Sequence, residues 1–163
     1  MYKVIQEYLE HSASIYADKT AFSDEKRELS FGNLQKRAKE IACFLHGLGL
    51  FRRPAVVFLD KGTSCVEAMM GAVYSGNFYT VLDVYMPQAR ISRIMHVLCP
   101  AVILTDGEHR EAAEAFADGA QVIDLDEIGR EDVDVQVLGQ IREEMAADDT
   151  LYVLFTSGST GTP

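Results

Sequence analysis

Short apolar runs recur along the sequence from Leu29 onward. Each run is rich in valine, isoleucine, leucine and aromatic residues, and hydrophobic and polar positions alternate only weakly within it. Such runs are typical of β-strands that are buried on both faces of a sheet. We therefore predict strands at 55–60, 79–83, 101–106, 121–126 and 151–156.

The segments between these runs carry apolar residues at helical spacing. In the first segment, the apolar positions of residues 34–48 fall on one face of a helix, and Ser30 is suited to cap its amino-terminal end. Further stripes predict helices over 66–73, 91–98 and 112–116. Residues that commonly end helices follow the four stripes, at Gly47–Gly49, Gly76, Pro100 and Gly119.

The alternation of strands and helices predicts the fold class. Successive strands start about 20–30 residues apart, which is the spacing of strand–helix–strand units in a parallel sheet. We expect an α/β fold, a Rossmann-like three-layer parallel sheet with helices on both faces, as a single domain over residues 1–163. The beginning differs, since a helix at 3–13 precedes a possible hairpin formed by "TAFSD" and "RELS".

Composition bears on the size of the core, the cellular location and the state of the cysteines. The chain has 163 residues, 48% of them hydrophobic, which is enough for one well-formed core. No apolar run has the length of a membrane span, and the charged beginning lacks the apolar core of a signal peptide, so a cytoplasmic location is expected. Cys43, Cys65 and Cys99 form no CxxC pair, so we expect reduced cysteines that pack in apolar surroundings.

Charge is unevenly distributed. The net charge is −10, and residues 124–149 hold ten acidic and two basic side chains. No basic stripe exists, so nucleic-acid binding is not expected. The acidic stretch is most simply a solvated connection and helix face, with an acidic docking surface as the alternative.

The last predicted strand runs into a loop of glycine, serine and threonine. Gly158 and Gly161 allow backbone conformations in which successive N–H groups point at one anion, and the hydroxyl side chains around them add donors. A loop at the carboxyl end of a strand lies where α/β sheets bind ligands. The Walker A pattern is absent, because Thr162 rather than lysine follows Gly161. A phosphate site and a plain polar turn both fit the composition.

Other candidate residues carry weaker signals. Asp60, Asp83 and Asp106 each end a predicted strand, where they either face a ligand or cap the turn or helix that follows. The four histidines, at 11, 46, 96 and 109, are scattered without a serine or cysteine partner at diagnostic spacing, so none is expected to be catalytic.

The segment "YVLFTSGSTGTP" closely resembles the phosphate loop of the adenylate-forming, AMP-binding enzymes. That loop reads Thr-Ser-Gly-Ser/Thr-Thr-Gly-x-Pro-Lys-Gly, and residues 156–163 match it at every position before the lysine. The superfamily includes adenylation domains of nonribosomal peptide synthetases, D-alanine–carrier-protein ligases, acyl-CoA synthetases and luciferases. The resemblance implies the N-terminal part of the acetyl-CoA-synthetase-like fold.

Two earlier blocks extend the resemblance. Residues 29–50 resemble the family's early block, and residues 67–106 resemble the next one, in which Leu82-Asp83, Pro87 and Arg90 keep the family order. Val84 departs from it, since the family has proline after the aspartate. The Leu-Asp style favours amino-acid adenylation domains, and acyl-CoA synthetases remain the alternative.

The resemblance implies an activity and its ligands. A carboxylate and ATP, with Mg²⁺, form an acyl-adenylate and pyrophosphate, and the acyl group then passes to the thiol of a carrier protein or of coenzyme A. The residues implied to hold the β- and γ-phosphates are Thr156, Ser157, Gly158, Ser159, Thr160 and Gly161. No catalytic residue and no metal ligand is assigned to this chain.

Family members run to several hundred residues, so the chain is expected to be the truncated N-terminal portion of an AMP-binding domain. We expect it to be inactive alone, with no tightly bound ATP or Mg²⁺. Because apolar faces that contact the rest of such a domain become exposed, we also expect self-association. The alternative from another class is a non-catalytic α/β module that binds phosphate or a protein.

Overall fold

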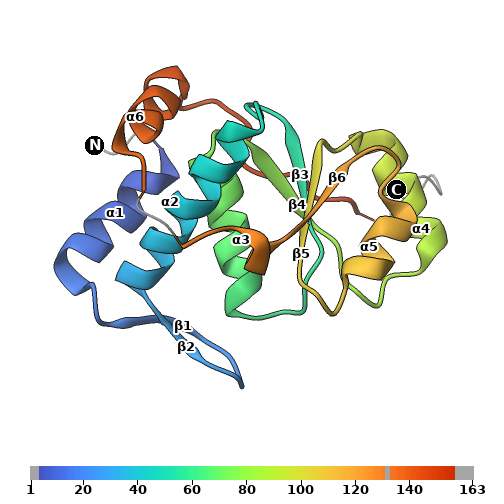
Figure 1. The fold of residues 1–163 in the computed structure, drawn as a ribbon, viewed down its shortest axis with the longest axis horizontal. Coiled ribbons are helices and arrows are strands. Elements are labelled where there is room, and N and C mark those ends of the chain that lie inside the picture. The colour runs from blue at the N-terminus through green and yellow to red at the C-terminus, as the bar shows by residue number, and fades with distance from the viewer. Residues whose placement is uncertain (1–3, 131–132, 157–163) are drawn as a thin grey trace.

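The computed structural model describes residues 4–130 and 133–156, and Figure 1 shows a central parallel sheet between two layers of helices. The strands are β1 (Thr20–Ser23), β2 (Glu28–Ser30), β3 (Pro54–Val57), β4 (Phe78–Val81), β5 (Val102–Thr105) and β6 (Gln121–Asp124). The helices are α1 (Ile5–Tyr16), α2 (Phe31–Gly47), α3 (Thr63–Tyr74), α4 (Gln88–Leu98), α5 (Arg110–Phe116) and α6 (Val135–Glu144), with a 3-10 helix at Leu125–Glu127.

The main sheet has four strands in the order β4-β3-β5-β6, and all neighbouring pairs are parallel. Ala55 in β3 lies opposite Tyr79 on one side and Val102 on the other. Since every connection returns to start a parallel strand, all four carboxyl ends lie at the same edge. That edge holds the candidate site.

The two faces of the sheet build separate cores. On one face, Ala55 and Val57 pack with residues of α2 and α3; on the other, Val56 packs with residues of α4 and α5. Three of the four residues of β3, Ala55, Val56 and Val57, are fully buried, which explains why its sequence hardly alternates. The predicted α/β class, with a parallel sheet and helices on both faces, is confirmed.

Close contact between α2 and α3 depends on a small residue. A Cβ atom added to Gly71 in α3 would lie 2.4 Å from the Cγ2 atom of Ile41 in α2. The backbone of α3 at Gly71 therefore packs directly against the Ile41 side chain of α2. The amino-terminal end of α2 is capped as predicted, since the Asn33 N–H donates to the Ser30 hydroxyl.

Helix α1 and the β1–β2 hairpin add a further layer outside α2. Leu9 of α1 and Leu29 of β2 pack with Leu34 and Ala38 of α2 in a third buried cluster. Strands β1 and β2 pair antiparallel, as the hairpin expectation required. These additions enlarge the core beyond the three layers that were predicted.

Several predicted boundaries shift in the structure. The predicted strand 151–156 forms only one isolated parallel bridge, between Tyr152 and Tyr79. Helix α6 lies within the acidic stretch, in agreement with the expected solvated connection and helix face, for which no bounds had been predicted. Cys99 is exposed in a left-handed conformation, so the expectation that it packs in the core is wrong. Of the helices in the described ranges, none combines the length and apolar character that crossing a membrane requires.

Candidate functional site

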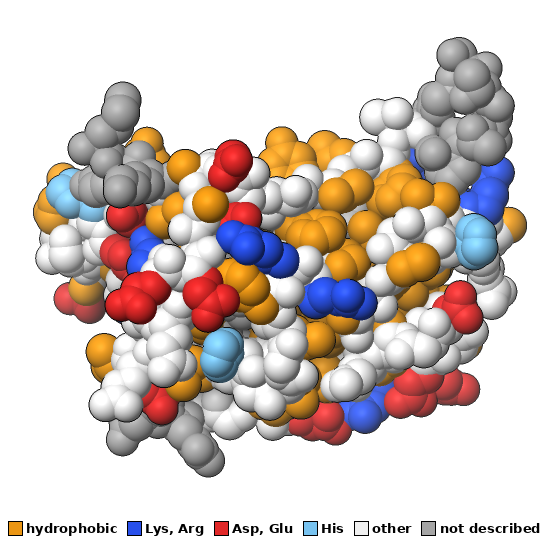
Figure 2. Space-filling view, turned by 90° about the horizontal axis from the view of Figure 1, so that it is seen from above, with side chains coloured by type: hydrophobic (Ala, Val, Ile, Leu, Met, Phe, Trp, Pro, Cys, Tyr) orange, Lys and Arg blue, Asp and Glu red, His pale blue; other side chains and the backbone are white. Residues whose placement is uncertain are grey.

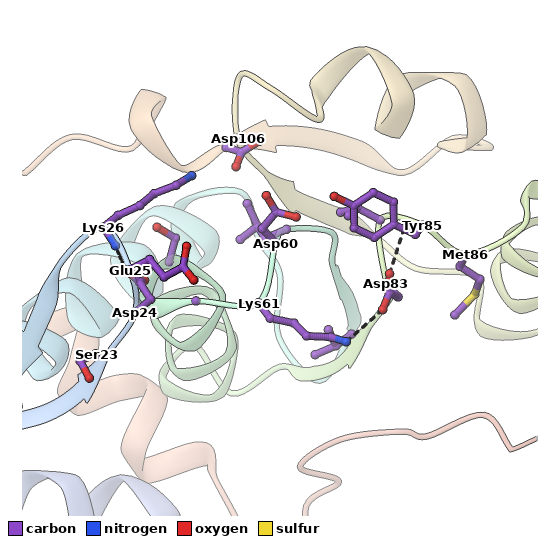
Figure 3. Close-up of a pocket in the computed structure, with 15 residues that line it drawn as sticks. Ser23, Asp24, Glu25, Lys26, Asp60, Lys61, Asp83, Tyr85, Met86 and Asp106 are labelled. Carbon is purple, nitrogen blue, oxygen red and sulfur yellow. Dashed lines mark hydrogen bonds and ion pairs between the residues drawn. The ribbon is translucent and has the colours of Figure 1, made fainter.

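A cleft of about 800 Å³ opens at the carboxyl edge of the sheet (Figure 3). Segments that follow β3, β4 and β5 form most of it, and the tip of the β1–β2 hairpin closes one side. Its lining combines apolar and charged side chains: Leu59, Val81, Val84 and Met86, with Asp24, Glu25, Lys26, Asp60, Lys61, Asp83 and Asp106. The cleft lies at the edge where parallel sheets bind ligands.

The three strand-end aspartates predicted from the sequence meet in this cleft. Asp60 follows β3, Asp83 follows β4, and Asp106 follows β5, so adjacent strands deliver them to one place. The interpretation as turn or helix caps is confirmed for two of them. Asp83 accepts a hydrogen bond from the Tyr85 N–H at 2.9 Å, and Asp106 accepts one from the His109 N–H at the same distance.

Asp83 is held in its charged form. The Tyr85 N–H donates to it, and the Lys61 ammonium group lies 3.2 Å from its carboxylate. Both contacts favour the anion, so the pKa of Asp83 is below its ordinary value. Tyr85 itself lines the cleft and is 87% exposed.

The hairpin tip is fastened across the beginning of α3 by one carboxylate. Asp24 accepts hydrogen bonds from the backbone N–H groups of Thr63, Lys26 and Arg27. The Thr63 bond, at 2.7 Å, joins the hairpin to the first turn of α3. These donors, with the Thr63 N–H contributing most, lower the pKa of Asp24 far below its usual value.

A second link reinforces this attachment. The guanidinium of Arg27 binds the Glu67 carboxylate with both terminal nitrogens, at 3.1 and 2.6 Å, and Glu67 is buried in α3. Paired hydrogen bonds of this kind fix orientation as well as distance. The hairpin is therefore held in place as one wall of the cleft. The sequence carried no local signal for these contacts, because the residues that make them are far apart in the chain.

His109 lies beside two of the strand-end aspartates, although no role was predicted for it from the sequence. Its ring Nδ1 lies 2.7 Å from Asp106 Oδ1, and its Nε2 lies 3.9 Å from Asp60 Oδ1. The ring is only 13% exposed and packs edge-on against Phe58. The Asp-x-x-His spacing at 106–109, placed directly after a strand, was the available signal.

The segment that leads into the predicted phosphate loop runs along the outer side of β4. The Tyr79 N–H donates to Leu151 O, and the Val153 N–H donates to Tyr79 O. Further along, Arg90 at the start of α4 donates to Phe155 O at 3.3 Å. Since the pairing is parallel, the chain advances toward the carboxyl edge of the sheet.

Thr156, the first residue of the predicted loop, is exposed at the end of this segment. The other five predicted phosphate contacts, Ser157, Gly158, Ser159, Thr160 and Gly161, lie outside the described residues. Their position therefore stays a prediction from the sequence. The direction of residues 151–155 is the structural observation that bears on it.

The family of the chain follows from a sequence comparison. The profile of the family described as AMP-binding enzyme matches residues 9–163, which is nearly the whole chain. The chain belongs to the AMP-binding enzyme family.

The curated relatives include peptide synthetases. The chain is 27% identical over 162 residues to tyrocidine synthase 1 of Brevibacillus parabrevis, covering 99% of this chain and 15% of that protein. It is 26% identical over 162 residues to bacitracin synthase 1 of Bacillus licheniformis, covering 99% of this chain and 3% of the relative. The chain thus spans only a small share of the relatives' length.

Solved structures share the fold. The fatty acid AMP ligase of Legionella pneumophila aligns with a TM-score of 0.83 at 18% identity, covering 100% of this chain and 30% of the other. The peptide synthetase FmoA3 bound to α-methyl-L-serine-AMP aligns with a TM-score of 0.81 at 22% identity, covering 95% and 17%. These likenesses show that the chain has the acyl-CoA-synthetase-like fold.

The fastening of the hairpin predicts a pH-dependent effect of Asp24→Ala. The pKa of Asp24 is lower in the folded protein than in the unfolded chain, so its carboxylate stabilises the fold above pH of about 4. That contribution disappears as the pH falls toward the lowered folded-state pKa. We expect Asp24→Ala to melt at a lower temperature than the wild type at pH 7, with the difference shrinking progressively from pH 4 downward.

Thermal melting followed by circular dichroism measures this difference. Glu25→Ala is the matched control, because Glu25 lines the same cleft next to Asp24 and is exposed. The control should melt like the wild type at every pH. Equal melting temperatures of wild type and Asp24→Ala at pH 7 would show that the hairpin does not depend on this carboxylate.

Proposed function

We propose that this chain is the nucleotide-phosphate-binding part of an ATP-dependent ligase that activates an amino acid as its acyl-adenylate. The observation that carries the proposal is the placement of the final segment. Residues 151–155 run parallel to β4 toward the carboxyl edge of the sheet, and in the sequence they are followed by "TSGSTG". A glycine-rich loop leaving a strand at that edge is where phosphates bind in α/β folds.

The residue types of the loop suit this task. The transferred groups of ATP carry negative charge on phosphoryl oxygens, and successive backbone N–H groups with hydroxyl donors can hold them without a covalent step. Gly158 and Gly161 free the backbone to form such a cradle. When Mg²⁺ is bound, it shares the neutralisation of the phosphates; none of the residues of this chain is assigned as its ligand in that reaction.

An amino acid is the proposed substrate class, with a carrier-protein thiol as acceptor. Peptide synthetases among the relatives support this choice over a fatty acid. The order Leu82-Asp83, Pro87 and Arg90 also follows the style of amino-acid adenylation domains. The alternative is an acyl-CoA synthetase, which uses coenzyme A as acceptor and forms the same kind of acyl-adenylate. The chain also shares its fold with a fatty acid AMP ligase, so a fatty acid is the alternative substrate class.

We further propose that residues 1–163 form one α/β domain that does not catalyse adenylation alone. Support comes from the small share of the relatives that the chain spans, 15% of tyrocidine synthase 1. An adenylating site needs a carboxylate pocket and charge neutralisation of the phosphates in addition to a phosphate loop.

The test is carboxylate-dependent exchange of labelled pyrophosphate into ATP. The chain alone should give no exchange above a no-enzyme control with a panel of amino acids and fatty acids. The product of the same gene, read onward from Pro163 through the expected Lys-Gly, should give exchange with an amino acid. In that product, Thr160→Ala should lower the exchange rate about tenfold or more, since hydroxyl contacts to a developing charge are worth that much, and Thr150→Ala should not.

Two results would overturn the proposal. Exchange by residues 1–163 alone would show that the domain is complete for catalysis. A reading frame that stops at Pro163, with no ATP-dependent activity, would favour the non-catalytic α/β module.

We also propose that the chain self-associates. Figure 2 shows hydrophobic side chains gathered over one face of the molecule, between scattered lysine and arginine residues. In the final segment, Tyr152 is 49% and Leu154 is 71% exposed. This segment pairs with β4 through a single bridge, so its outer backbone groups offer an edge to another chain.

Sedimentation velocity at rising protein concentration tests self-association. The wild type should shift from monomer to dimer or larger species, and Leu154→Glu should remain monomeric because it places a charge on the contact. Val135→Glu is the control, since Val135 is 77% exposed on α6, and it should associate like the wild type. A wild type that stays monomeric throughout would contradict this proposal.

A further inference from the structure

We propose that Asp60, Glu108 and His109 form a binding site for a divalent transition-metal ion at the edge of the cleft, with Asp106 as the residue that orients the histidine. One ligand atom from each of the three residues lies within 4.8 Å of the other two. The proposal goes beyond adenylation, because it concerns a different set of residues and an ion that binds without nucleotide.

The topology explains why these residues meet. Asp60 follows β3 and the pair Glu108–His109 follows β5, and these two strands are neighbours in the parallel sheet. Both segments therefore leave the sheet at the same edge. Figure 3 shows Asp60 and Asp106 lying near one another at the wall of the cleft.

The imidazole of His109 is held in one orientation. Asp106 Oδ1 accepts from both the backbone N–H of His109, at 2.9 Å, and its ring Nδ1, at 2.7 Å. The ring also packs edge-on against buried Phe58, with 6.0 Å between ring centroids. A carboxylate that accepts from one ring nitrogen sets the tautomer of a neutral histidine, so the lone pair is on Nε2.

That lone pair faces other acceptors. His109 Nε2 lies 3.9 Å from Asp60 Oδ1, a separation too long for a direct hydrogen bond. Among the described residues, the Glu108 carboxylate makes no hydrogen bond or ion pair, and nearby Lys61 is paired with Asp83 instead. Three electron-rich atoms therefore lie within 4.8 Å of one another. A metal ion bound by all three atoms would offset their mutual repulsion.

The ligand set favours a transition metal over Mg²⁺ or Ca²⁺. One imidazole nitrogen with two carboxylate oxygens suits Zn²⁺, Co²⁺ or Mn²⁺, whereas Mg²⁺ and Ca²⁺ prefer oxygen alone. Ligand atoms around Zn²⁺ lie roughly 3.4 Å apart, from a metal–ligand distance of about 2.1 Å. The carboxylates must therefore close inward, which they can do because the Asp60 side chain is 46% exposed and Glu108 is exposed.

Three protein ligands leave at least one position of a tetrahedral ion open. Since Asp60 and Asp106 line the cleft, an open position at this site is accessible to water or to an anionic group of a ligand in the cleft. A metal ion bound at this site would therefore allow the acidic wall of the cleft to bind an anion.

Isothermal titration of the metal-free chain with Zn²⁺, in the absence of nucleotide, tests the site. We expect one Zn²⁺ per chain. His109→Gln and Asp60→Asn should weaken this binding by more than Asp106→Asn, for which loss of the orienting carboxylate predicts a decrease of about 10–100-fold. His96→Gln is the matched control; His96 is exposed on α4, and its replacement should leave the affinity unchanged.

Circular dichroism establishes that each variant is folded, and Glu108→Gln gives a second ligand variant at an exposed position in case His109→Gln unfolds. The absence of Zn²⁺ binding by the wild type would overturn the proposal. Equal affinity in wild type and all three ligand variants would also overturn it. Because no ATP is present, neither result depends on the adenylation proposal.

Discussion

The burial of β3 on both of its faces is the constraint on which the architecture depends. A strand whose residues face apolar layers on both sides needs helices above and below it, and parallel neighbours supply those helices through their connections. Every strand of the main sheet then ends at the same edge. The cleft, the three strand-end aspartates and the direction of the final segment all follow from that arrangement.

Elements with strong periodicity were predictable from the sequence. The runs that became β3 to β6 and the stripes that became α2 to α5 each reflect burial against the sheet, so their patterns carry the fold. Helix α6 buries only Ile141, and a helix with so narrow an apolar contact leaves little pattern to read. The segment 151–156 reads as a strand, yet it has a neighbour only at β4 and forms a single bridge.

The candidate site was predictable in part for the same reason. Asp60, Asp83 and Asp106 meet because each follows a parallel strand, a relation visible in the sequence. The wall formed by the hairpin was not, since it depends on Asp24 and Arg27 reaching α3 across dozens of residues. The proximity of His109 to Asp60 could not be predicted, because it depends on the pairing of β3 with β5.

The central claim is that the loop after residues 151–155 holds nucleotide phosphates. Backbone amide NMR of the ¹⁵N-labelled chain during titration with ATP and Mg²⁺ tests this claim directly, because it detects weak binding residue by residue. The account predicts progressive shifts of the amides of residues 156–161 with an affinity no tighter than the millimolar range, while the amides of α1 and α6 stay unchanged. An absence of shifts in residues 156–161, or shifts confined to other parts of the chain, would contradict it.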